Sequence, residues 1–289
     1  MAARPKTWGV AAAPVITGLA IALSETHCFD LLTAVLTAVL AILMQIITNM
    51  ENDAGYTKRK AERSDRKGLP RATSLGLLSI QEVEQAIKVI AFIALLLTLY
   101  FIYIGSWFFL LITICSVIAA YLYMGGPKPI AYTPLGEGIV VLFFGLTAVG
   151  GTYYLQTLSL SWTVLSLGFA LGLIAAAVLC VNNYRDCEHD AGVGRHTLAV
   201  VLGKNKTALA YQWMLFLPYV ILLIIVALDP QRWPYLAAFF SFPKAIKLPK
   251  ELKKLSGFQL NDVLFKTVKL ELLFAFTLSF GALAHYFIS

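Results

Sequence analysis

Charged residues are scarce in this chain. Asp, Glu, Lys and Arg make up only 13% of its 289 residues, whereas hydrophobic residues make up 59%. Together with a mean hydropathy of +0.76, this composition lies outside the range of soluble domains. The scarcity of charge therefore excludes a soluble domain and predicts an integral membrane protein embedded in the lipid bilayer.

Several other signals are missing from the sequence. It contains no Ser/Gly-rich linker, coiled-coil heptad or low-complexity tract, so we expect one domain over residues 1–289. The first apolar stretch lacks a small-residue cleavage site, and we interpret it as a membrane helix rather than a cleavable signal. The cysteines show no CxxC spacing, which disfavours a zinc site or a disulfide framework. The four cysteines are Cys28, Cys115, Cys180 and Cys187.

Long apolar stretches dominate the remainder of the chain. Stretches of roughly 20 apolar residues are long enough to cross the hydrocarbon core of a bilayer. We therefore expect an all-α, polytopic bundle of nine transmembrane helices around a central cavity. The expected spans are residues 8–24, 30–50, 86–105, 107–124, 135–156, 162–183, 207–228, 233–248 and 269–288.

The basic residues are distributed unevenly between the two sides of this predicted bundle. With nine helices, Arg232 is the only one of the 23 Lys and Arg residues that falls on the far side from the N-terminus. Because cytoplasmic loops carry most Lys and Arg, we expect a cytoplasmic N-terminus and a C-terminus on the opposite side. The net charge of +7 then reflects topology and an anionic partner, and no feature indicates nucleic-acid binding.

Polar residues concentrate in two segments that each follow an apolar stretch. They are residues 49–71, here the first polar cluster, and residues 182–197, here the second polar cluster. Ionisable groups near or within a membrane are costly, and they usually mark a functional site. The two clusters therefore suggest two halves of one site.

The second polar cluster has the composition of a metal and phosphate site. Asn182, Asp186 and Asp190 are spaced four residues apart and would share one face of a continuing helix. Neighbouring carboxylates repel one another, and a bound cation such as Mg²⁺ would relieve that repulsion while sharing its shell with substrate phosphates. Arg185 and Arg195 are suited to phosphate oxygens. The alternative is a helix end that is merely solvated.

The first polar cluster contains the same residue types. Asn49, Asn52 and Asp53 come first, and a basic stretch follows them. Its glycines and proline predict breaks, so we expect much of this cluster to form an ordered loop over the cytoplasmic mouth of the bundle. The basic residues at 58–60 have two equally good explanations: they anchor this side of the chain in the cytoplasm, as the positive-inside rule requires, or they act in the site.

Together the clusters predict a site for a diphosphate that carries an apolar tail. Mg²⁺ and basic side chains would stabilise the charge of a departing pyrophosphate. The allylic carbocation left behind would need aromatic faces. The chain has 18 Phe, 13 Tyr and five Trp, although most aromatics in such a protein are core or interface residues.

At this point the residues resemble a known family, the UbiA-type intramembrane aromatic prenyltransferases, and within it the 1,4-dihydroxy-2-naphthoate polyprenyltransferases of menaquinone synthesis. The resemblance runs nearly from end to end. The matching motifs are RPKT at 4–7, the Asn-Asp of the first polar cluster, GGPKPIAYTPLGE at 125–137, NNYRD at 182–186, GRHTLAVVLG at 194–203 and KT at 266–267.

The resemblance implies Mg²⁺-dependent transfer of a polyprenyl chain from a polyprenyl diphosphate to an aromatic acid, with loss of pyrophosphate and of the ring carboxyl. The expected metal ligands are Asn52, Asp53, Asp65, Asp186 and Asp190. The expected diphosphate ligands are Asn49, Arg66, Lys67, Arg71, Arg185 and Arg195. The residues expected to act in catalysis are Asp53, Asp186, Asp190, Lys128 and Tyr132.

The first polar cluster departs from the family pattern at two positions. Tyr56 stands where the pattern has an Asp, and Glu62 replaces a later Asp. A tyrosine is a poor Mg²⁺ ligand at neutral pH because its pKa near 10 keeps it protonated. Two alternatives to the naphthoate function stay open: another acceptor such as 4-hydroxybenzoate, homogentisate or a tetrapyrrole, and a non-catalytic lipid-binding or transport protein.

Overall fold

The computed structural model describes residues 2–27, 29–61, 70–105 and 107–288, and these residues form helices and no strand. The predicted all-α fold is therefore confirmed. In chain order the helices are η1 (Pro5–Thr7), α1 (Trp8–Thr26), α2 (Leu31–Lys58), α3 (Ile80–Ile104), α4 (Phe108–Met124), η2 (Ile130–Tyr132), α5 (Gly136–Val140), η3 (Val141–Thr147), α6 (Ala148–Thr157), α7 (Trp162–Arg185), α8 (Cys187–Gly192), α9 (Leu198–Leu228), η4 (Pro230–Ser241), α10 (Phe242–Lys254), η5 (Gly257–Gln259) and α11 (Leu260–Tyr286).

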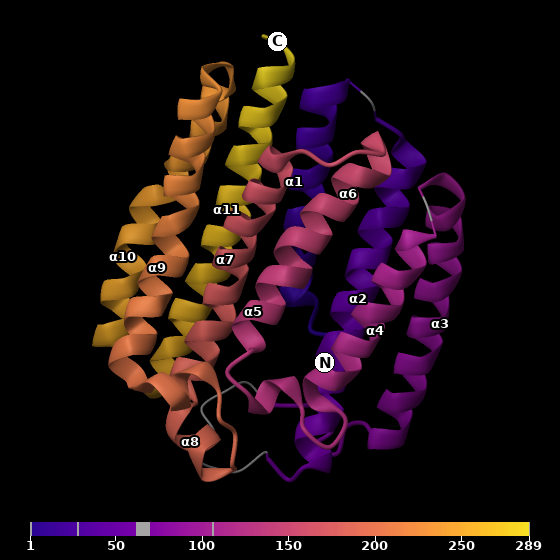
Figure 1. Ribbon diagram of the computed structural model, residues 1–289. Coiled ribbons are helices and arrows are strands. Elements are labelled where there is room, and N and C mark those ends of the chain that lie inside the picture. Colours follow the sequence, from indigo (N-terminus) through magenta and orange to yellow (C-terminus); the bar gives the residue numbers. More distant parts are fainter. Residues whose placement is uncertain (1, 28, 62–69, 106, 289) are drawn as a thin grey trace.

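Membrane-length helices make up most of the bundle in Figure 1. Within the described residues, seven helices are long and apolar enough to cross a membrane, and α4 is a shorter apolar helix. One of the seven spans, residues 136–157, is built from α5, the π-helix η3 and α6. The predicted span at 233–248 is formed by the 3₁₀ helix η4 followed by α10, so the expected count of nine is approximate.

Polar side chains fix the points at which several of these helices begin. Asp30 caps α2, because its Oδ1 accepts a hydrogen bond from the backbone N–H of Thr33 at 2.6 Å. Ser79 and Glu82 form a reciprocal capping box at the start of α3. Such caps satisfy backbone N–H groups that have no partner within the helix.

The core of the protein centres on α7. Of the seven spans, α7 has the largest buried share, 67%, whereas α3 has the smallest, 22%. Gly145 of η3 lies against α7, and a Cβ added there would sit 2.5 Å from the carbonyl oxygen of Gly168. Small residues permit such close helix contacts, so this glycine serves a contact inside the bundle.

Several predicted helix boundaries differ from the structure; the helices predicted to begin at residues 86 and 269 begin at Ile80 and Leu260. The helix predicted to end at residue 50 continues to Lys58, which places Asn52, Asp53 and Tyr56 on α2 rather than in a loop. Gly55 does not break this helix; it lies against Met124 of α4, and a Cβ there would be 2.7 Å from the Met124 Cβ. The helix predicted at 207–228 begins earlier, at Leu198, and bends at Gly203, whose φ of +73° suits glycine.

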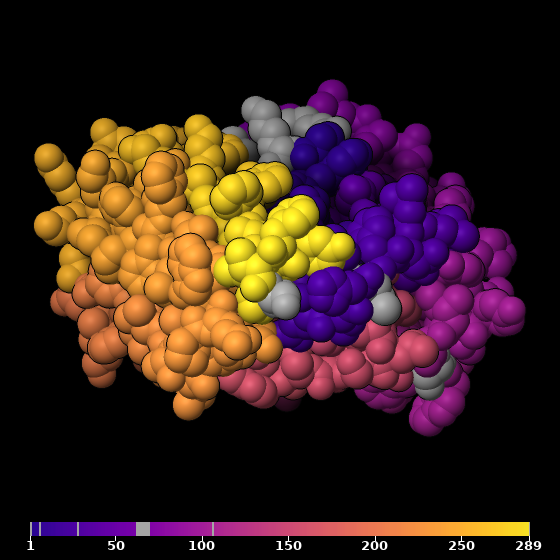
Figure 2. Space-filling model, turned by 90° about the horizontal axis from the view of Figure 1, so that it is seen from above, coloured from indigo at the N-terminus to yellow at the C-terminus, as the bar shows by residue number. Residues whose placement is uncertain are grey.

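The two ends of the bundle differ in character. The described residues of both polar clusters lie at the lower end in Figure 1, whereas the C-terminal end of α11 lies at the upper end. At the upper end Arg232 forms ion pairs with Glu25 and Asp229. Figure 2 shows the end of α11 (yellow) between α1 (indigo) and the α9–η4 region (orange). The bundle therefore presents one strongly polar end, where a site can form.

Candidate functional site

Three segments that are distant in the sequence meet at the polar end of the bundle. The end of α2 meets α8, because His189 Nε2 donates a hydrogen bond to the carbonyl of Ala61 at 2.9 Å. The segment between α4 and α5 joins them, because the backbone N–H of His196 donates to the carbonyl of Tyr132 at 3.0 Å. The two polar clusters are thus halves of one assembly, with the 125–135 segment as a third part.

Arg195 links all three segments from a buried position. Its guanidinium donates to Asp190 Oδ1 at 2.7 Å, to the carbonyl of Ala131 at 3.0 and 3.1 Å, and to the hydroxyl of Tyr56. Burial lowers the pKa of Arg195 to about 10, so the side chain still carries its positive charge at neutral pH. Arg195 is therefore a charged, fixed donor at the centre of the site.

Tyr56 occupies the space between two arginines. Its side chain is 2% exposed, and its ring centre lies 3.6 Å from the Arg71 guanidinium carbon and 4.9 Å from that of Arg195. Arg71 also donates to the backbone carbonyl of Asn52 at 3.0 Å. Desolvated cation–π contacts of this kind are worth about 2 kcal/mol. Tyr56 therefore holds both basic groups in place.

Asp53 anchors the chain that follows the first polar cluster. Its Oδ2 accepts from the backbone N–H of Ala72 at 3.0 Å, and its Oδ1 accepts from the N–H and the hydroxyl of Thr73 at 2.9 and 2.7 Å. A carboxylate has about four lone-pair sites, two on each oxygen, so Oδ1 is fully used and Oδ2 keeps one. Asp53 is thus a structural anchor whose remaining lone pair on Oδ2 is still suited to a metal ion.

Arg185 and Asp186 form a buried pair at the end of α7. Arg185 donates to both carboxylate oxygens of Asp186, from Nη2 at 2.7 Å and from Nε at 2.9 Å. Nη2 also donates to Asn182 Oδ1, and Nη1 donates to Asn261 Oδ1, each at 2.6 Å. Bidentate arginine–carboxylate pairs are strong and well oriented. Asp186 and Asp190 of the second polar cluster thus each already have an arginine partner.

The remaining predicted residues fall into different places. The Asn49 amide donates to the carbonyl of Ala3 and the hydroxyl of Thr7, at 3.1 and 3.0 Å, so it holds the N-terminal segment. Tyr132 is half-buried beside Arg195, with the guanidinium carbon 5.5 Å from its ring centre. Burial raises the pKa of the Tyr132 hydroxyl, which therefore stays protonated.

Some predictions concern residues with little or no described structure. Lys128 lies between α4 and η2 with an exposed side chain and, in the part of the chain that the structure describes, makes no contact with the acidic residues. Asp65, Arg66, Lys67 and Glu62 lie outside the described residues. Their predicted roles stay predictions.

Two further site residues were assigned no specific role from the sequence. Arg59 extends from the end of α2 and donates to the carbonyls of Met124 and Gly126, which ties α2 to the 125–135 segment. Glu137, at the start of α5, accepts a hydrogen bond from Asn183 of α7 at 2.9 Å. A buried acid at the start of an apolar helix is the one signal that could have revealed Glu137.

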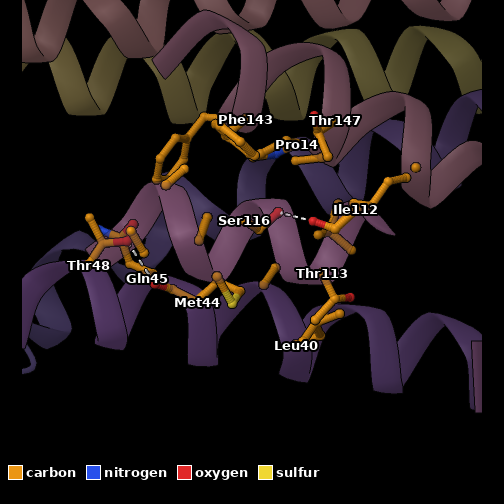
Figure 3. Close-up of a pocket in the computed structure, with 18 of the residues that line it drawn as sticks. Pro14, Leu40, Met44, Gln45, Thr48, Ile112, Thr113, Ser116, Phe143 and Thr147 are labelled. Atoms are coloured by element: carbon orange, nitrogen blue, oxygen red, sulfur yellow. Dashed lines mark hydrogen bonds between the residues drawn. The ribbon is translucent and has the colours of Figure 1, made fainter. Parts of the chain in front are cut away.

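An apolar cavity of about 280 Å³ extends from this polar end into the bundle. It lies between α1, α2, α4 and the η3–α6 region, as Figure 3 shows for Pro14, Met44, Ser116 and Phe143. Its α2 lining runs from residue 37 to residue 52, which at about 1.5 Å per residue corresponds to roughly 22 Å. The cavity thus connects Asn52 at the polar end with the middle of the membrane-spanning region.

The donor chemistry of the site suits a divalent cation held together with phosphates. Mg²⁺ prefers oxygen ligands and uses one or two carboxylates, water and substrate phosphates. The described residues contain no group of three or more His, Cys, Asp or Glu side chains arranged to hold a metal, but Asp186, Asp190, Asp53 and Asn52 supply oxygens of this kind. Their donor set therefore fits Mg²⁺ as a partner of a bound diphosphate rather than of the protein alone.

Comparison with known proteins identifies the family of this chain. The UbiA prenyltransferase family matches residues 11–252. A 1,4-dihydroxy-2-naphthoate octaprenyltransferase of Haemophilus influenzae is 36% identical over 71% of this chain and 68% of its own length. The Bacillus subtilis protein of the same name is 28% identical over 98% of this chain and 91% of its own.

The solved structure of a UbiA homolog from Archaeoglobus fulgidus, bound to GPP and Mg²⁺, has the same fold. It superposes with a TM-score of 0.72 at 16% identity and covers 97% of both chains. The fold, the extent of the family match and the sequence relatives agree over most of the chain. This multi-pass membrane protein therefore belongs to the UbiA prenyltransferase family.

Proposed function

We propose that the protein transfers a polyprenyl chain from an allylic prenyl diphosphate to 1,4-dihydroxy-2-naphthoate, with release of pyrophosphate and loss of the ring carboxyl. The names of the Haemophilus influenzae and Bacillus subtilis relatives support this acceptor. The observation that carries the proposal is the pair of buried arginine–carboxylate contacts, Arg185–Asp186 and Arg195–Asp190, at one end of the apolar cavity.

The basic residues of the rim would bind the diphosphate. Arg71, Arg185 and Arg195 would turn part of their hydrogen bonding from carboxylates and carbonyls to phosphate oxygens, which guanidinium groups bind with matching geometry. Lys128, Arg66 and Lys67 would contribute further positive charge from the surrounding segments. These groups stabilise the negative charge that develops as the allylic carbon–oxygen bond breaks.

The acidic residues released by this exchange would hold Mg²⁺. Asp186 and Asp190 would serve one ion, and Asn52, Asp53 and Asp65 would serve another. When bound, Mg²⁺ neutralises charge on the diphosphate. Tyr132 would place an aromatic face near the reacting carbon, where a ring attracts cationic character. The cavity walls keep water away from the reacting carbon.

The direct test combines the purified protein, incorporated in lipid nanodiscs, with Mg²⁺, 1,4-dihydroxy-2-naphthoate and prenyl diphosphates of several lengths. We expect a prenylated, decarboxylated product and pyrophosphate, and strong loss of both in Asp186→Ala. Glu188→Ala is the matched control, because Glu188 lies two residues away on α8 and is exposed. Absence of product, or full activity of Asp186→Ala, would contradict the proposal.

A panel of acceptors separates this function from its nearest alternative. Preference for 4-hydroxybenzoate or homogentisate over the naphthoate would reassign the acceptor within the same family. Binding of prenyl diphosphate without pyrophosphate release in the presence of every acceptor would instead favour a lipid-binding role.

The polar end of the bundle would face the cytoplasm. Nearly all basic residues lie on that side of the predicted topology, as the positive-inside rule requires. A reporter that is active only outside the cytoplasm should therefore be active when it is fused to the C-terminus. An inactive reporter of this kind would reverse the orientation.

A further inference from the structure

Glu137 and Asn183 form a buried pair that the chemistry outlined above does not use. Asn183 Nδ2 donates to Glu137 Oε1 at 2.9 Å, and the two residues are 4% and 3% exposed. Within the described residues, the other oxygen of each side chain, Glu137 Oε2 and Asn183 Oδ1, is buried and accepts no hydrogen bond. Buried polar atoms are nearly always paired, so these two oxygens indicate a donor that binds here.

The pair lies beside the polar end of the cavity. Ile139 and Val140, which follow Glu137 in α5, line the cavity. Tyr123 also lines it, and the Tyr123 hydroxyl lies in the electrostatic field of both Glu137 and Asp190. Glu137 and Asn183 are not lining residues themselves, so the pair lies just behind the cavity wall at this end.

The cavity wall offers further acceptor oxygens. Gln45 Oε1 and Asn52 Oδ1 belong to lining residues of α2, and within the described part of the chain neither oxygen has a hydrogen-bond partner. Apolar walls with a few acceptor oxygens suit a flat apolar ligand that carries hydroxyl donors. A diphosphate presents acceptor oxygens only and would be repelled by the Glu137 carboxylate, so the expected ligand is a phenolic ring.

We propose that Glu137, held in place by Asn183, accepts a hydrogen bond from a phenolic hydroxyl of the aromatic substrate and so positions the ring. This inference rests on the proposed function and identifies a positioning residue for the acceptor rather than for the diphosphate. A hydroxyl that donates to a carboxylate also gives its ring more electron density. That makes the ring carbon a better nucleophile toward an allylic cation.

Glu137→Gln tests this role with little change in shape. The new amide group can donate to Asn183 Oδ1, so the pair stays packed, but the acceptor oxygen offered to the ligand is replaced by a donor. We expect the KM for the aromatic acceptor to rise roughly ten- to a hundredfold, the effect of losing one hydrogen bond to a charged group. The KM for the prenyl diphosphate should be unchanged.

Glu271→Gln is the matched control. Glu271 is another fully buried carboxylic acid, and it lies on α11, a helix that contributes no residue to the cavity lining. This variant should leave both KM values unchanged. Equal rises of both KM values in Glu137→Gln, or the same rise in Glu271→Gln, would overturn the inference.

Analogues that lack one hydroxyl give a second test that does not depend on turnover. Equilibrium binding of 1,4-dihydroxy-2-naphthoate, 1-hydroxy-2-naphthoate and 4-hydroxy-2-naphthoate is measured for the wild type and Glu137→Gln. If Glu137 contacts one hydroxyl, removing that hydroxyl should weaken binding to the wild type but not to the variant, as in a double-mutant cycle. Equal losses in both proteins for both analogues would refute the contact.

The binding test also separates this inference from the proposed function. If the wild type forms no prenylated naphthoate but the hydroxyl-dependent coupling is present, the proposed reaction is contradicted, whereas the contact between Glu137 and a ligand hydroxyl is supported. If product forms without coupling, the function stands and Glu137 has another role. Should Glu137→Gln not fold, Glu137→Asp, which retracts the carboxylate by one methylene, is expected to weaken acceptor binding selectively.

Discussion

The guanidinium of Arg71 lies over the ring of Tyr56, with its carbon 3.6 Å from the ring centre. On the same tyrosine, the hydroxyl accepts a hydrogen bond from Arg195. One aromatic residue thus orients an arginine from each polar cluster. Tyr56, the position where the resemblance predicts an acidic residue, therefore has a structural role of its own, because it holds these two arginines in place.

Tyr56→Phe should weaken the link between the clusters without removing the Arg71 contact. The change deletes the hydroxyl that accepts from a buried charged donor, so we expect a loss of about 1–3 kcal/mol in the free energy of unfolding. Thermal unfolding in detergent measures this loss. Tyr103→Phe, at an 87% exposed position, is the control and should be neutral; equal stability of the two variants would disprove the role of the hydroxyl.

Tyr56→Asp should change the metal requirement. A carboxylate at this position would lie between Arg71 and Arg195, one helical turn from Asp53. The two carboxylates could share a Mg²⁺ ion. We expect the Mg²⁺ concentration for half-maximal activity to fall. Tyr56→Asn introduces a side chain of the same size as Asp but without the charge, so it should not lower this Mg²⁺ concentration. A metal requirement that is the same in Tyr56→Asp and Tyr56→Asn would contradict the prediction.

Ser116→Phe should shorten the space available to the prenyl chain. Ser116 lines the cavity in Figure 3, and a phenyl group there would fill part of it. We expect kcat/KM for long prenyl diphosphates to fall roughly 5- to 150-fold, which corresponds to a loss of about 1–3 kcal/mol of transition-state stabilisation. The effect on dimethylallyl diphosphate should be smaller. Cys115→Phe, on the neighbouring exposed position, should show no dependence on chain length. A uniform loss across all lengths would argue against this path for the tail.

Gly145→Ala should destabilise the packing of η3 on α7. The added Cβ would lie 2.5 Å from the Gly168 carbonyl oxygen and 2.7 Å from the Gly172 Cα, both backbone atoms that cannot move independently. Overpacking of this kind costs about 1–3 kcal/mol. Gly138→Ala meets no atom within 4 Å and should be neutral or stabilising by thermal unfolding. An unchanged melting temperature for Gly145→Ala would show that the two helices can separate.

The membrane spans could be predicted from the sequence because their cause is local. A bilayer requires each span to be apolar and to satisfy its backbone internally, so the stretch at 162–183 predicted α7 to within two residues at its end. Boundaries next to polar residues were less predictable. Asn52, Asp53 and Tyr56 looked like the start of a loop, but α2 continues through them because Gly55 packs closely against Met124.

The contacts within the site could not be predicted in the same way. Tyr56 and Arg195 are 139 residues apart, Asn183 and Glu137 are 46 apart, and His189 reaches Ala61 across 128 residues. Residue type and helical spacing identified the acids and arginines of the second polar cluster. Neither could indicate that Arg185 and Arg195 would already be bound to Asp186 and Asp190.

The sequence by itself determined an all-helical membrane protein with its basic residues at one end and two polar clusters there, because hydropathy and charge act residue by residue along the chain. Only the tertiary structure decided which side chains meet: that Tyr56 lies between two arginines, that Asp53 anchors the segment at Ala72 and Thr73, and that Glu137 pairs with Asn183 beside the cavity. The physical reason is that these contacts depend on how α2, α5 and α7 pack against one another. Helix packing is set by the shapes of many side chains at once.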